Sequence, residues 1–154
     1  MCILMTVDLQ RFLSFARDLF IKDGWTSSII PTVDLVLKKE FQTSIVLTVH
    51  QLFFIDADQL KKEEIFQIID QIHNDSTGQP PLVSRVNQII FVFENASESI
   101  VSLLQENGKE QKVSTAVSTV CWSVDLNHKK LFIHKGRPFI YKGKKEINHI
   151  LLQF

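Results

Sequence analysis

Residues 113–141 constrain the fold most, because they contain the clearest β-strand pattern of the chain. Within them, residues 120–125 (VCWSVD) alternate between large apolar and smaller or polar side chains, the two-residue period of a half-buried strand. Residues 127–129 (NHK) predict a hairpin connection, and residues 131–134 return as the next strand. The apolar residues before Ser118 have the opposite parity, which predicts a bulge or turn near that serine. We therefore expect two or three neighbouring strands here.

The rest of the chain alternates segments of helical spacing with further strand-like runs. Apolar residues recur every three or four positions in residues 9–20, 65–72, 100–104 and 147–154. The strand-like runs are residues 25–30, 33–37, 44–49 and 87–93. Helices that alternate with strands predict a mixed α/β (α+β) fold, in which a central mixed β-sheet is flanked by about four helices. Residues 1–154 suit a single domain of this kind.

Boundary signals accompany three of the predicted helices. Gly24 follows the first helix and supplies a left-handed stop. Asp56 or Asp58 is expected to begin the second helix. Asn95, with Glu98 three residues later, resembles the capping box of the third helix.

Composition excludes a disordered chain, because 45% of the residues are apolar while Gly and Pro number only 5 and 4. The apolar start of the chain is brief and is followed at once by Asp8 and Arg11, unlike a signal peptide. No uninterrupted apolar run approaches the length of a membrane span. Cys2 and Cys121 make no disulfide framework, so we expect a cytoplasmic protein.

The charge is zero overall but is distributed unevenly. Residues 126–154 carry seven basic side chains against the single acid Glu146. These basic side chains, named here the basic face, are Lys129, Lys130, Lys135, Arg137, Lys142, Lys144 and Lys145. Such a cluster either guards a sheet edge against aggregation or attracts an anionic partner: a protein, a lipid headgroup or a nucleic acid.

No residue set in the sequence requires a particular chemistry. Cys121 lies on a predicted strand without a basic neighbour to lower its pKa, so we expect a structural cysteine. His128 and His134 could approach Asp125 across the hairpin, but the histidine spacing matches no metal motif. The glycines are isolated and form no phosphate-binding loop. We therefore predict neither a metal nor a cofactor, and no small-molecule ligand can be named.

The alternative enzymatic hypothesis is a metal-dependent nuclease or phosphodiesterase. Its site would use Asp34, Glu40 and Asp125 to hold a divalent metal. Gln42 stands where such a site would need a lysine. A structure that brings these carboxylates together in an open cleft would favour this hypothesis.

Residues 87–107 (NQIIFVFENASESIVSLLQEN) and 122–139 (WSVDLNHKKLFIHKGRPF), followed by a helix start at Lys145, are similar to a known family. They resemble the soluble N-terminal domain of some bacterial rhomboid intramembrane proteases, with Trp122 and Asp125 in a matching turn. The resemblance implies a cytosolic α/β domain distantly like restriction-endonuclease cores, which serves the membrane part as an adaptor or regulator. The chain lacks the membrane helices and Ser–His dyad of the protease, so no protease residue is carried over.

The leading hypothesis from the sequence is a non-catalytic interaction or regulatory module. We expect a protein partner, contacted through the basic face, and a location in the cytoplasm or at the inner face of a membrane. The alternatives are the nuclease-like enzyme described above and a nucleic-acid-binding domain.

Overall fold

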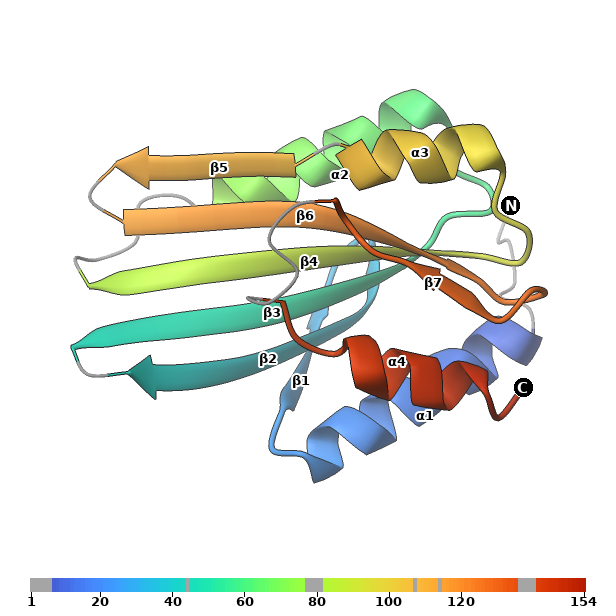
Figure 1. Cartoon of the computed structure of the whole chain (residues 1–154), viewed down its shortest axis with the longest axis horizontal. Coiled ribbons are helices and arrows are strands. Elements are labelled where there is room, and N and C mark those ends of the chain that lie inside the picture. The colour runs from blue at the N-terminus through green and yellow to red at the C-terminus, as the bar shows by residue number, and fades with distance from the viewer. Residues whose placement is uncertain (1–6, 44, 77–81, 107, 114, 136–140) are drawn as a thin grey trace.

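The computed structural model describes residues 7–43, 45–76, 82–106, 108–113, 115–135 and 141–154. These residues form one mixed β-sheet with helices on both faces, which confirms the predicted fold class (Figure 1). The helices are α1 (Val7–Lys22), α2 (Lys62–Asp75), α3 (Glu98–Glu106) and α4 (Lys144–Leu151). The strands are β1 (Thr26–Ile30), β2 (Val33–Thr43), β3 (Val46–Asp56), β4 (Val83–Phe93), β5 (Gly108–Val113), β6 (Thr115–Asp125) and β7 (Lys130–Phe132).

The strand order is β1-β2-β3-β4-β6-β5, and β7 pairs with the far end of β6. Strands β1, β2 and β3 form an antiparallel meander, whereas β3, β4 and β6 run parallel to one another. Parallel neighbours need a crossover connection, and α2 and α3 supply the two that this sheet requires. The carboxyl ends of β3, β4 and β6 therefore meet at one edge of the sheet.

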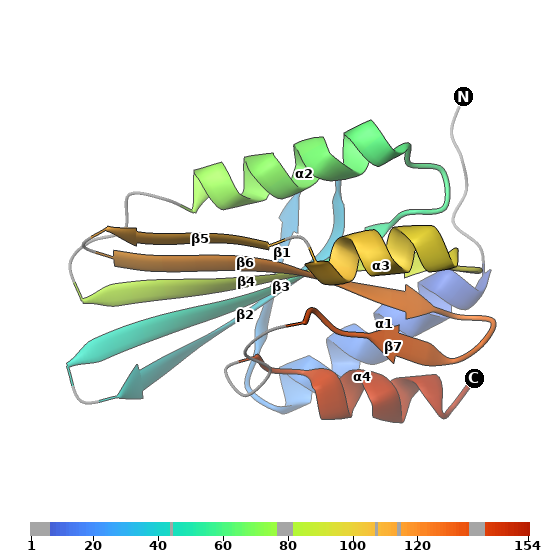
Figure 2. The ribbon, with the colours of Figure 1, turned by 45° about the horizontal axis from the view of Figure 1, so that its top comes forward.

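Helices α1 and α4 cover one face of the sheet, and α2 and α3 cover the other (Figure 2). The first face buries Phe12 and Phe20 of α1 and Ile147 and Ile150 of α4 against Phe54 and Trp122 of the strands. The second face buries Ile65, Ile69 and Ile72 of α2 and Leu104 of α3 against Ile89, Phe91 and Phe93 of β4. Strand β4 is buried on both faces from Val86 onwards, as expected for a central parallel strand.

One predicted helix boundary and one predicted helix are confirmed. Gly24 ends α1 with a φ of +93°, and the N–H of Trp25 donates to the Phe20 carbonyl at 3.0 Å. The apolar stripe at the carboxyl end forms α4, and Phe154 beyond it packs its ring against Phe12.

Other predicted boundaries were wrong. The second helix begins at Lys62, because Asp56 and the residues after it close β3 and form a turn. The cap of α3 is Ser97 rather than Asn95, since the Ser97 hydroxyl accepts the N–H of Ile100 at 3.3 Å. Asp56 and Asp58 therefore do not cap a helix. Their carboxylates instead accept backbone N–H groups at the sheet edge, as described below.

The strand predictions also needed correction. Strand β6 runs without a break through Ser118, and the parity change arises because β6 is buried on both faces, with Val117 and Val120 on opposite sides of the strand. Strand β5 was not predicted at all, and β2 continues past Leu37 to Thr43. The hairpin after β6 is confirmed, and β7 returns at Lys130. A third strand of the 113–141 segment, expected after residues 131–134, would fall at residues 139–141, of which only Tyr141 is described.

Candidate functional site

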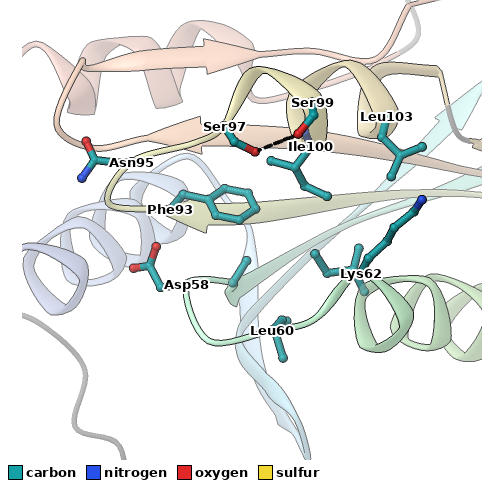
Figure 3. A pocket seen from close by; sticks show the side chains of 11 residues that line it. Asp58, Leu60, Lys62, Phe93, Asn95, Ser97, Ser99, Ile100 and Leu103 are labelled. Carbon is teal, nitrogen blue, oxygen red and sulfur yellow. Dashed lines mark hydrogen bonds between the residues drawn. The ribbon is translucent and has the colours of Figure 1, made fainter.

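A groove of about 500 Å³ opens at the carboxyl edge of the parallel strands, between α2 and α3 (Figure 3). Its apolar side chains are Ala57, Leu60, Ile65, Phe93, Ile100 and Leu103. Its polar side chains are Asp58, Lys62, Asn95, Ser97 and Ser99. Ligands of open α/β sheets bind at this edge, just beyond the carboxyl ends of the strands. We name this feature the α2–α3 groove.

The groove follows from how β3 and β4 end. Phe93 is the last residue of β4, and its ring lies between the two helices at the centre of the groove (Figure 3). Ile100 and Leu103 reach toward it from α3, while Leu60 lies in the turn that leads into α2. Helices α2 and α3 pack on the same sheet face, where α2 lies against β4 and β6 and α3 lies against β6. The space between their first turns remains open.

A chain of aspartates fixes the wall of the groove after β3. The N–H of Asp56 donates to Asp34 at 2.7 Å, and the N–H of Asp58 donates to Asp56 at 3.2 Å. The Asp58 carboxylate in turn accepts the N–H of Glu94 at 3.0 Å. These contacts join the start of β2 to the ends of β3 and β4. Partial burial raises the pKa of both Asp34 and Asp58, and their backbone donors oppose that shift.

Asp125 performs the same structural task at the end of β6. Its carboxylate accepts the N–H of Ala96 at 3.2 Å and the N–H of His128 at 3.0 Å. The imidazole of His128 also lies 3.0 Å from it. The α3 start and the β6–β7 turn are therefore held together by one buried carboxylate.

The structure does not bring the three carboxylates of the enzymatic hypothesis together. Asp34 and Glu40 lie six residues apart on β2, which is about 20 Å in an extended strand. Asp125 is separated from β2 by β3 and β4. Glu40 instead lies 3.8 Å from Lys38. Within the described part of the chain, no three His, Cys, Asp or Glu side chains are placed to hold a metal ion.

Cys121 is buried on β6 and faces α2 and α3. Burial raises the pKa of its thiol to about 12, so the thiolate form needed for nucleophilic attack is not populated near neutral pH. The structural role expected for this cysteine agrees with that environment.

The described residues of the basic face lie on several elements of the structure. Lys129 and Lys130 lie at the β6–β7 turn, where Lys129 has a φ of +55°. Lys135 lies 3.9 Å from Glu106, which offsets its charge. Lys142 precedes α4, and Lys144 and Lys145 form its first turn; Arg137 falls outside the described residues. These residues thus lie on two elements that contact each other, β7 and α4, and on the segments beside them.

Comparison with protein-family models, curated protein sequences and solved structures gives no match. The resemblance to rhomboid N-terminal domains and the restriction-endonuclease-like core therefore stay predictions. Among the helices in the described ranges, none combines the length and the apolar character that a bilayer crossing requires.

Sequence reasoning missed the residues of the α2–α3 groove. Phe93 and Ile100 were assigned to a strand and a helix, and Lys62 was placed inside a helix rather than at its start. The sequence contains one signal for this groove, which is the position of its polar residues. Short polar runs at residues 56–58 and 94–97 follow two successive strands. In a parallel pair those runs must lie at the same sheet edge.

Proposed function

We propose that this chain is a non-catalytic interaction module, and that it binds an uncharged, apolar segment of a partner protein in the α2–α3 groove. The observation that carries the proposal is an open apolar groove at the sheet edge where α/β proteins bind their ligands. The proposal keeps the non-catalytic role expected from the sequence and moves the binding surface away from the basic face.

The state of the nearby side chains supports binding rather than catalysis. Asp58 and Asp125 are occupied by backbone N–H donors, which is a structural use of a carboxylate. Ser97 caps α3, so its hydroxyl is also engaged. The Cys121 thiol is buried and protonated. The reactive groups at this end of the molecule thus hold backbone in place.

The composition of the groove selects the type of partner. Its centre is formed by Phe93, Ile100 and Leu103, which favour apolar side chains. The charged side chains lining it are Asp58 and Lys62, one of each sign, so the groove offers no net charge to steer an ionic ligand. The exposed Asn95 amide nitrogen can donate to the backbone of a bound segment, while its oxygen accepts the Asn127 amide at 2.8 Å. The Ser99 hydroxyl, 3.4 Å from the Ser97 hydroxyl, retains capacity for a further hydrogen bond.

The test places a large side chain in the groove by substituting an exposed residue of α3. A library of random linear peptides is selected on the wild-type chain, and the selected peptides are measured by fluorescence anisotropy. We expect apolar peptides whose affinity falls at least about tenfold in Ser99→Trp, equivalent to about 1.4 kcal/mol, because the indole fills the groove.

Ser102→Trp is the matched control, since Ser102 is also exposed on α3 but does not line the groove. Its affinity for the same peptides should equal that of the wild type, and circular dichroism should show both variants folded. Equal binding to the Ser99 and Ser102 variants, or selection of highly charged peptides that bind both, would overturn the proposal.

A further inference from the structure

A second cluster of functional groups lies on the opposite sheet face, beside the start of α4. The ring of Phe41 on β2 has the Lys142 ammonium 5.0 Å from its centroid and the Lys39 ammonium 5.4 Å from it. The imidazole of His50 on β3 meets the same ring edge-on, with the centroids 5.1 Å apart. We name Lys39, Phe41, His50 and Lys142 the Phe41 cluster.

The cluster is held rigidly by the sheet. Lys39 and His50 are directly opposite each other across β2 and β3. The Gln88 side chain fixes Lys142 by donating to its carbonyl at 2.7 Å and accepting its N–H at 2.9 Å. Gly143, the next residue, begins α4 and packs so closely that an added Cβ would lie 3.2 Å from Leu52 Cδ1. The backbone of Lys142 is thus fixed before any ligand arrives, and the backbone of Lys39 is fixed by its strand pairing.

The face around the cluster is accessible. Figure 1 shows α1 and α4 over one half of the sheet, while β2, β3 and β4 extend beyond both helices. Lys142 is exposed, and Phe41 and Lys39 are half-buried. His50 lies beneath them and is only 5% exposed.

The positive charge here is not balanced. Among the described residues, neither Lys39 nor Lys142 lies within ion-pair distance of a carboxylate. The Lys39 ammonium donates to the Asp23 carbonyl, and the neighbouring Glu40 lies on the other face of β2. The Nδ1 atom of His50 is buried without a hydrogen-bond partner. Burial, and secondly the charge of Lys142, lower the His50 pKa to about 4.

We propose that the Phe41 cluster binds a phosphate anion, free or as a small phosphate monoester, between the ammonium groups of Lys39 and Lys142. Two ammonium groups near one aromatic ring supply positive charge of the kind that a phosphate dianion requires. The first turn of α4 adds N–H groups without a side-chain cap, together with the positive end of its dipole. A bound anion also offsets the charge of Lys142, which contributes to lowering the His50 pKa.

The test follows the His50 imidazole by NMR while inorganic phosphate is added to the full chain at constant ionic strength. We expect a saturable shift of its resonances and a rise of its pKa in the phosphate complex. Lys142→Met should weaken phosphate binding at least about fivefold. Lys129→Met, which removes the same charge at the β6–β7 turn, is the matched control and should bind as the wild type does.

A parallel titration with phenyl phosphate distinguishes the two sources of the anion. Tighter binding of the ester assigns the site to phosphate monoesters, and equal binding assigns it to free phosphate. A shift that grows linearly without saturation, or equal affinity in the Lys142 and Lys129 variants, would overturn the site. The inference is independent of the α2–α3 groove, so Ser99→Trp should leave phosphate binding unchanged.

Discussion

Gly143→Ala is the substitution whose effect the structure defines most closely. Gly143 has a φ of +91°, a conformation that costs an L-residue about 1–2 kcal/mol. Its added Cβ would also lie 3.1 Å from Phe20 Cζ and 3.2 Å from Leu52 Cδ1. Both neighbours are fully buried, so neither can move aside freely. Overpacking of this kind adds about 1–3 kcal/mol.

We therefore expect Gly143→Ala to lower the free energy of unfolding by about 3 kcal/mol. Gly24→Ala isolates the backbone part, because Gly24 has nearly the same φ of +93°. Its added Cβ would meet only the Lys39 ammonium at 3.4 Å, at the end of a flexible side chain. The Gly24 variant should lose only about 1–2 kcal/mol.

Urea denaturation followed by tryptophan fluorescence measures both variants, since Trp25 and Trp122 are buried. The two losses should differ by at least about 1 kcal/mol with unchanged m-values. Equal losses would mean that the α4 start is not packed against Phe20 and Leu52 as described. A loss below about 0.5 kcal/mol in both variants would refute the backbone argument as well.

Three further predictions concern single side chains. In a Cys2→Ser background, Cys121 should react with a thiol reagent at pH 8 only as fast as the chain unfolds, because the pKa of its thiol is raised to about 12. Fast labelling of the native chain would contradict this prediction. The pKa of His50 is about 4 in the folded chain, against an ordinary value of 6.5, so the unfolded chain takes up a proton first as the pH falls. Stability should thus be complete above pH 6.5 and fall by about 2 kcal/mol toward pH 4, a loss that His50→Gln should remove in denaturation curves. Thr32 is β-branched and has a φ of +70°, a strained backbone conformation for such a residue. Thr32→Gly should therefore raise the free energy of unfolding by about 1 kcal/mol, and a lower urea midpoint would disprove the strain.

The fold class could be predicted because local periodicity reports which faces are buried. The stripes of α1 and α4 and the alternation of β6 depend only on that rule. Strand β5 (GKEQKV) carries no such pattern, because an edge strand can be charged throughout. The extension of β2 was hidden in the same way, since Lys38, Lys39 and Glu40 resemble a break although they continue the ladder.

The two candidate sites could not be predicted from local pattern, because each combines segments that only the sheet order brings together. The α2–α3 groove joins residues 57–65 to residues 93–103. The Phe41 cluster joins β2 and β3 to Lys142, which lies about 90 residues further along the chain. The basic face stays a prediction: its described members lie on the β6–β7 turn, after β7 and at the start of α4.

The chain of aspartates links the fold to the proposed function. Asp34, Asp56 and Asp58 pass hydrogen bonds from β2 to β3 and then to the N–H of Glu94 after β4. Asp58 lines the α2–α3 groove, and in each of the three aspartates a carboxylate oxygen accepts a backbone N–H. Carboxylates at this edge are therefore needed whether or not any reaction occurs there. An acidic sheet edge is thus weak evidence for a metal-dependent enzyme, and the proposed binding function rests on the groove beside that edge.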